Sequence, residues 1–97
     1  MSITGVNKTV EKEIINIAIQ NQIEKIVLFG SRARGDCKHT SDIDLAVSGG
    51  NISAFSLEVN EEVSTLLEFD IVNLDGMVQE ELLETIKKEG RCIYEKI

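Results

Sequence analysis

Proline is absent from this sequence, and no linker, internal repeat or low-complexity tract divides its 97 residues. A chain of this length can build one domain with a modest core, so we expect residues 1–97 to form a single domain. The sequence also has no long apolar segment and no basic and apolar leader, which argues against a membrane span and a signal peptide. We therefore expect a cytoplasmic protein that does not associate with membranes.

Basic residues are scarce in comparison with acidic ones. The sequence has 10 lysines and arginines against 17 aspartates and glutamates, a formal net charge of −7. Surfaces that bind nucleic acid gather lysine and arginine on one face, so this balance argues against direct binding of nucleic acid. Cys37 and Cys92 have neither the spacing of metal ligands nor that of a disulfide framework, and free thiols fit a reducing compartment.

The chemistry that is present is concentrated between Ile26 and Val47. The apolar run Ile26–Phe29 predicts a buried central strand that helices cover on both faces. Directly after it comes the turn Gly-Ser-Arg-Ala-Arg-Gly, in which Gly30 permits a close backbone approach and Ser31 begins a short helix. The N–H groups at a helix N-terminus favour an anion, so the turn predicts a phosphate-binding site at the end of the strand.

The segment Ser41–Val47 predicts a second strand that carries two carboxylates. Alternation along the strand places Asp42, Asp44 and Ala46 on one face, which is expected to be exposed, and apolar side chains on the other. The two carboxylates then stand about 6.6 Å apart, so both can reach one hard divalent cation. A nucleoside triphosphate with a bound divalent cation suits both the glycine turn and the carboxylates of the second strand. The glycine motifs of P-loop and dinucleotide-binding proteins are absent, which excludes those alternatives.

Hydrophobic periodicity predicts three longer helices, over residues 7–22, 53–67 and 77–89. The first should begin with Asn7 as its N-cap and bury one stripe of side chains. This stripe comprises Val10, Ile14, Ile15, Ala18 and Ile19. The third should have acidic residues near its N-terminus, lysines in its last turn, and Gly90 directly after its end.

Two further strands are predicted, over residues 69–74 and 92–94. Asp70 interrupts the apolar run of the first, and because burial of an unpaired carboxylate is costly, it should have a partner. Tyr94 either anchors the last strand or accepts a nucleotidyl group. His39 is either a solvent-exposed loop residue or a general base.

The pair Gly30-Ser31, followed after ten residues by Asp42-Ile43-Asp44, resembles the signature of the nucleotidyltransferase superfamily typified by DNA polymerase β. The fuller string, Gly-Ser-Arg-Ala-Arg-Gly leading to Ser-Asp-Ile-Asp-Leu, resembles the minimal single-domain members, the MNT proteins. These are commonly MntA-type antitoxins paired with a HEPN-domain toxin. The resemblance implies an α/β (α+β) nucleotidyltransferase fold, in which helices flank a small mixed β-sheet.

The resemblance also implies a catalytic and metal-binding set. Asp42, Asp44 and Asp70 would hold two Mg²⁺ ions, with Glu68 or Asp75 as alternatives for the third place. The position of Asp70 inside an apolar run favours it over the other two. Without metal the clustered carboxylates repel each other, so at least one of them should have a raised pKa.

For the nucleotide, the resemblance assigns Gly30 and Ser31 to the phosphates of ATP, the expected substrate. Arg32 and Arg34 stand in the same turn. Each either donates hydrogen bonds to a triphosphate oxygen or ties the loop to a neighbouring carboxylate, and the sequence leaves both roles open.

The activity that the resemblance implies is transfer of AMP from ATP to a hydroxyl, that of a tyrosine being favoured, on a HEPN-type toxin. The modification would silence the toxin. We expect these 97 residues to build no second domain that could hold an acceptor, and we therefore expect the acceptor to arrive on the partner protein. Two other functions stay open: an antitoxin that neutralises by binding alone, and a nucleotidyltransferase for a small molecule such as an aminoglycoside.

Overall fold

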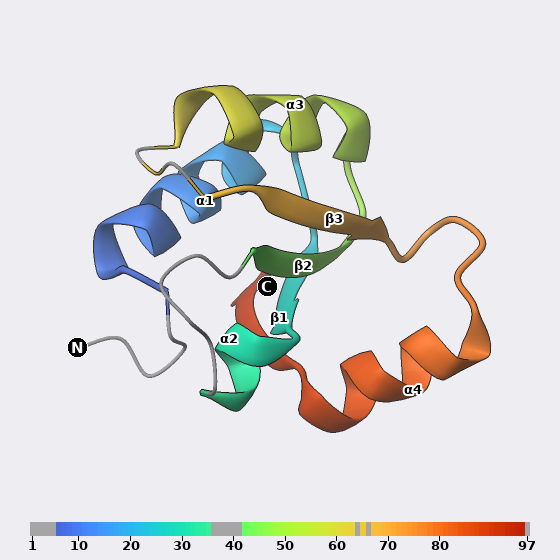
Figure 1. The fold of residues 1–97 in the computed structure, drawn as a ribbon. Coiled ribbons are helices and arrows are strands. Elements are labelled where there is room, and N and C mark those ends of the chain that lie inside the picture. The colour runs from blue at the N-terminus through green and yellow to red at the C-terminus, as the bar shows by residue number, and fades with distance from the viewer. Residues whose placement is uncertain (1–5, 36–41, 64, 66, 97) are drawn as a thin grey trace.

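The computed structural model describes residues 6–35, 42–63, 65 and 67–96. Along the chain the elements are α1 (Lys8–Gln20), β1 (Lys25–Phe29), α2 (Ser31–Arg34), β2 (Ile43–Ser48), α3 (Ile52–Glu62), β3 (Phe69–Asn73), α4 (Glu80–Glu89) and β4 (Arg91–Glu95). Figure 1 shows the helices arranged around a central sheet. The α/β class expected from the sequence is confirmed.

The sheet has four strands in the order β3-β2-β1-β4. β1 runs antiparallel to both of its neighbours, whereas β2 and β3 are parallel, so the sheet is mixed, as the resemblance implied. The central position of β1 follows from its sequence, because its side chains from Ile26 to Phe29 are apolar on both faces and all are buried.

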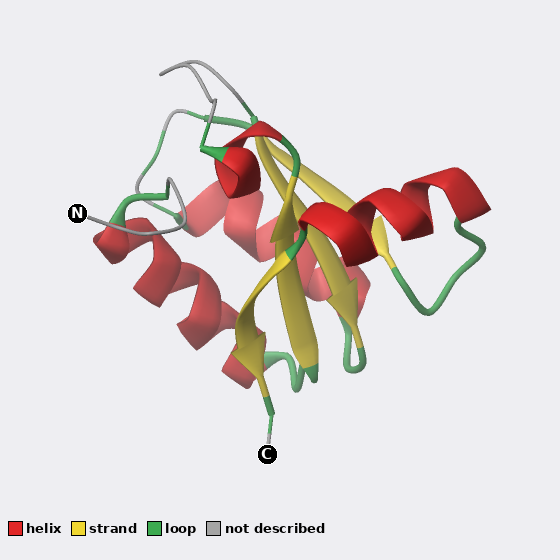
Figure 2. Cartoon of the chain, turned by 90° about the horizontal axis from the view of Figure 1, so that it is seen from below, coloured by secondary structure: helices red, strands yellow, loops and turns green. Residues whose placement is uncertain are grey.

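Helices cover both faces of the sheet, with α1 and α3 on one side and α4 on the other (Figure 2). The larger core lies beneath α1 and α3, where Ile14, Leu28 and Phe55 are fully buried. The smaller core joins Ile86 of α4 to Ala46 of β2. The expectation of an exposed acidic face was therefore wrong for Ala46, because α4 crosses that face and covers it.

α1 begins where the sequence predicts. The Asn7 side chain caps it by accepting a hydrogen bond of 2.8 Å from the backbone N–H of Thr9. The buried stripe differs in part from the expectation, because Ile17 is buried whereas Ile19 is 55% exposed. Ile17 lies less than one turn from Ile14 and shares its face, while Ile19 is turned toward solvent.

The other two long helices are shorter than predicted. α3 ends at Glu62 rather than near residue 67, because Val63 is extended (φ −73°, ψ 136°) and places its own side chain in the core. α4 begins at Glu80 rather than at Met77, whose side chain is fully exposed. No helix in the described part of the chain is both long and apolar enough to cross a membrane.

The end of α4 lies directly on β1 at Gly90. This glycine has an ordinary extended backbone (φ −68°, ψ 148°), so a left-handed conformation does not explain it. A Cβ at Gly90 would instead collide with the carbonyl oxygen of Ile86 and with the side chain of Val27. Glycine therefore permits the close contact between α4 and β1, and β4 begins at the next residue.

Candidate active site

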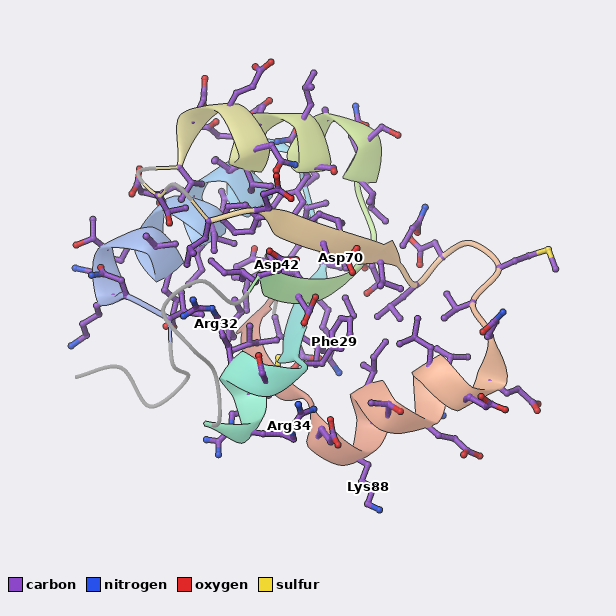
Figure 3. The ribbon with its side chains drawn as sticks, viewed as in Figure 1. Phe29, Arg32, Arg34, Asp42, Asp70 and Lys88 are labelled. Atoms are coloured by element: carbon purple, nitrogen blue, oxygen red, sulfur yellow. The ribbon has the colours of Figure 1, made fainter. Side chains whose placement is uncertain are left out.

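The predicted site residues gather at one end of the sheet, where β1 ends and β2 and β3 begin (Figure 3). The antiparallel pairing of β1 with β2 places Phe29 opposite Asp44. The parallel pairing of β2 with β3 places Asp44 beside Asp70. Asp42 stands directly before β2, at the same end. Strand register thus brings together three carboxylates from two separate segments of the chain.

Gly30 follows β1 and packs against the Asp44 side chain. Its backbone has φ +77°, a region that residues with a Cβ rarely adopt. A Cβ at this position would also collide with Oδ2 of Asp44, and would lie 3.2 Å from the Asp44 Cγ. Two independent constraints therefore require glycine here, and together they place the predicted phosphate turn directly against the carboxylate.

The predicted short helix that begins at Ser31 is present as α2, with Gly30 as its N-cap. The Gly30 carbonyl accepts hydrogen bonds of 3.1 Å from the N–H groups of both Ala33 and Arg34. The N–H groups that open α2 have no acceptor within the helix itself, because a helix cannot supply one to its first residues. They lie at the end of the sheet that carries the carboxylates, where an anion could accept from them.

The pKa of Asp44 is raised above its usual value. Partial burial, which penalises the ionised carboxylate, is the main cause, and the charges of Asp70 and then Asp42 add to it. The positive charge of Arg34 opposes the rise. The expectation that one carboxylate of the set has a raised pKa is therefore confirmed, and Asp44 is that carboxylate.

Asp70 differs from its expected environment, because its side chain is exposed and is not buried beside a partner. β3 is an edge strand, so a carboxylate near its start stays in contact with water. Among the alternatives, Asp75 lies beyond the other end of β3 and accepts a hydrogen bond of 2.7 Å from the N–H of Gly49. Asp70 is the carboxylate with the largest charge effect on Asp44.

The carboxylate set suits a divalent cation by its chemistry. It offers only oxygen donors, and Asp44 is repelled by both of its neighbours, a repulsion that a cation would relieve. Within the described residues, no three acidic, histidine or cysteine side chains are gathered tightly enough to hold an ion as they stand. Repulsion between like charges favours such a separation.

The two arginines of the turn diverge, as Figure 3 shows. Arg34 Nη1 lies 2.9 Å from Glu89 Oε2 of α4 in a partly exposed ion pair. Arg32 is only 8% exposed and lines a cavity of about 190 Å³ together with Asn7 and Thr65. Arg34 thus forms the ion pair with a neighbouring carboxylate, which was one of the two roles that the sequence left open. Contact of either arginine with phosphate stays a prediction.

Two residues at the site were not found by sequence reasoning. They are Glu89, which pairs with Arg34, and Arg91, whose Nε donates a hydrogen bond of 3.0 Å to the carbonyl of Ala33. The partners are separated by 55 and 58 positions, so no local pattern could have revealed the contacts.

The remaining candidates fall into two groups. Cys37, His39 and Ser41 lie outside the described residues. Cys92 is a free, exposed thiol, and Tyr94 is half-buried against the larger core, which favours an anchoring role for this tyrosine.

The raised pKa of Asp44 predicts how stability changes with pH. The folded state holds the Asp44 proton more tightly than the unfolded state does, so the free energy of unfolding falls as the pH rises from the usual carboxyl pKa through the raised one. In metal-free buffer at about pH 7, Asp44→Asn should therefore raise the thermal midpoint, by about 1–4 °C because the carboxylate is partly solvated. The gain should disappear at about pH 3. An equal gain at both pH values, measured by thermal unfolding, would contradict this account.

Comparison with known proteins identifies the family of the chain. Residues 12–97 match the family of the polymerase β nucleotidyltransferase domain. A relative from Methanocaldococcus jannaschii, named "Putative protein adenylyltransferase MJ0604", is 31% identical over 96 residues, covering 86% of this chain and 93% of the relative. A crystal structure of a toxin–antitoxin with AMP-PNP matches with 26% identity and a TM-score of 0.68, over 89% of this chain and 73% of that chain. A crystal structure of the toxin–antitoxin MntA-HpeT matches with 23% identity and a TM-score of 0.69, over 94% and 75%.

The mixed sheet and its flanking helices define the nucleotidyltransferase fold, which these structural likenesses confirm. The chain belongs to the polymerase β nucleotidyltransferase family, since the family match spans most of its length.

Proposed function

We propose that this chain, acting as a single domain, transfers AMP from ATP to a hydroxyl on a partner protein, a HEPN-type toxin that the modification silences. The observation that carries the proposal is the packing of Gly30 against Asp44, with Asp70 in register beside it. This packing supports the proposal, because it brings the turn that would bind phosphate against one carboxylate of the set that would bind the cation. A protein acceptor is supported by the name of the 31% identical relative, and a toxin partner by the toxin–antitoxin structure with AMP-PNP. We place the reaction in the cytoplasm, where ATP is available.

The residues of the chain act on both ends of the reaction. The N–H groups that open α2 hold the β- and γ-phosphates, where negative charge grows as pyrophosphate leaves. Asp70 accepts the proton of the acceptor hydroxyl, because its exposed side chain can be reached by a group on another protein. The hydroxyl oxygen forms its bond to the α-phosphorus, and the bond from that phosphorus to the bridging oxygen breaks. Pyrophosphate leaves with the electron pair of the broken bond.

The three carboxylates are proposed to hold two Mg²⁺ ions, in keeping with a family that generally uses nucleoside triphosphates and divalent metals. Asp42 and Asp44 would hold the ions, with Asp70 as the third carboxylate of the set. When bound, such ions neutralise phosphate charge and lower the pKa of an attacking hydroxyl. The exposure of Asp42 and Asp70 leaves room for the phosphates and for water in the same site.

The proposal is tested by incubating the purified chain with host lysate, Mg²⁺ and ATP labelled at the α-phosphorus. A labelled protein band that depends on the chain is expected, and identification of the band names the acceptor. ATP labelled at the γ-phosphorus is the matched control, because nucleotidyl transfer leaves that label in pyrophosphate whereas phosphoryl transfer would place it on the protein. Chelation of divalent ions should remove the α-label.

Other outcomes would decide against the proposal. Label from γ-labelled ATP would assign phosphoryl transfer instead. Label that appears only when a hydroxylated small molecule such as an aminoglycoside is added would assign a small-molecule nucleotidyltransferase. No label, although ATP binds and the toxin partner is present, would favour an antitoxin that acts by binding alone.

A further inference from the structure

α2 depends on other elements for its position. It is a helix of 4 residues, and so short a helix is not stable in isolation. Its third residue, Ala33, is buried in the larger core. Its C-terminal side is held from outside, because Arg91 Nε donates to the Ala33 carbonyl at 3.0 Å and Glu89 Oε2 accepts from Arg34 Nη1 at 2.9 Å.

The two outside contacts come from residues on either side of Gly90. That glycine lies so close to Val27 of β1 that no side chain would fit between them. β1 in turn runs into Gly30, the N-cap of α2. β1 therefore fixes the beginning of α2, because Gly30 follows it directly. It also fixes the two residues that hold the end of α2, because they flank Gly90, which packs against the strand.

We propose that Glu89 and Arg91 are positioning residues that clamp α2, so that its opening N–H groups stay aimed at the phosphate site beside Asp44. The last carbonyls of a helix lack partners within the helix, and a cationic donor there is favourable. Without the Arg91 hydrogen bond the single turn of α2 can fray. Ordering the turn would then reduce the free energy of nucleotide binding. The kinetic part of this inference rests on the proposed function, whereas the clamp itself does not.

The two halves of the clamp differ in strength. The Arg91 hydrogen bond is partly buried and comes from a charged donor. The Arg34–Glu89 pair is partly exposed, with side chains 43% and 29% exposed, so solvent screens it.

The test compares Arg91→Ala, Arg91→Lys and Glu89→Gln with the wild type. Arg91→Ala should raise the KM for ATP and the Kd for AMP-PNP about tenfold with a smaller change in kcat, while Arg91→Lys, which keeps a cationic donor, recovers most of the affinity. Glu89→Gln should weaken binding about two- to threefold. The matched controls are Lys88→Ala and Glu84→Gln, because both residues are exposed on α4. The side chain of Lys88 points away from the carboxylates (Figure 3). Neither control should change the affinity.

Amide hydrogen exchange of residues 31–35 supplies a readout that needs no activity. Arg91→Ala should speed exchange there, and Arg91→Lys should restore most of the protection. Equal exchange and equal AMP-PNP affinity in Arg91→Ala and the wild type would overturn the clamp. A wild type that transfers no AMP would contradict the proposed function, but faster exchange in Arg91→Ala would still support the clamp.

Discussion

The double variant Asp42→Asn/Asp44→Asn should transfer AMP about 1,000-fold or more slowly than the wild type, because the charge stabilisation supplied by bound cations is worth several kcal/mol. Asparagine keeps the shape of each side chain but removes the negative charge that attracts a divalent ion. Asp44 is the carboxylate that packs against Gly30, so its charge lies where the turn would place the phosphates. Transfer from α-labelled ATP to the partner measures the loss.

Misfolding would not explain such a loss, because the substitutions relieve repulsion. Burial and two neighbouring carboxylates disfavour ionised Asp44, so the double variant should be at least as stable as the wild type in metal-free buffer. Asp75→Asn is the matched control, since this carboxylate lies beyond the other end of β3 and binds the N–H of Gly49. It should transfer AMP at the wild-type rate.

The same double variant separates catalysis from binding. If it fails both to modify and to neutralise the toxin, neutralisation depends on AMP transfer. If it still neutralises the toxin without modifying it, binding alone accounts for the antitoxin activity. Wild-type rates of modification would contradict the assignment of these two carboxylates.

Gly30→Ala should lower AMP transfer about 100-fold or more, since displacement of reacting groups by about 1 Å can cost that much. The new Cβ would collide with Oδ2 of Asp44. To relieve the collision, either the Asp44 side chain must turn away or the turn must move off β2. Both movements separate the phosphate site from the carboxylates, so the kcat/KM for ATP should fall with the affinity for AMP-PNP.

Gly35→Ala is the control for the backbone strain that alanine causes in this turn. Gly35 ends α2 in the left-handed region (φ +85°, ψ 8°), where alanine incurs a backbone strain of about 1 kcal/mol, whereas Gly30 (φ +77°, ψ −157°) lies in a region that is essentially restricted to glycine. Among the described residues, however, nothing lies within 4 Å of its Cβ position. Gly30→Ala should lose more stability than Gly35→Ala in thermal unfolding, because its Cβ also collides with Asp44. At a temperature where both variants are folded, only Gly30→Ala should lose most of the activity. Equal activity in both would show that the contact with Asp44 is unimportant.

Much of the fold could be predicted from local patterns. The apolar run of β1 predicts a central strand because only a strand covered on both faces buries every side chain. Asn7 marks the start of α1 because its side chain can cap the first turn. The end of α3 could not be predicted in this way, because Val63 leaves the helical conformation while its side chain stays in the core. Periodicity cannot distinguish a valine buried by a helix from one buried by the extended segment that follows it.

By itself the sequence determined the type of site, which has a glycine turn after a buried strand and then a strand with the Asp-x-Asp motif. Both motifs can be recognised because each consists of residues that are neighbours along the chain. Only the tertiary structure decided which groups meet. Strand register brings Asp70 beside Asp44, and packing brings Arg91 to Ala33 across 58 positions. Backbone preference and side-chain alternation act between near neighbours, whereas register and packing depend on how separate elements share one core, and no local pattern records that.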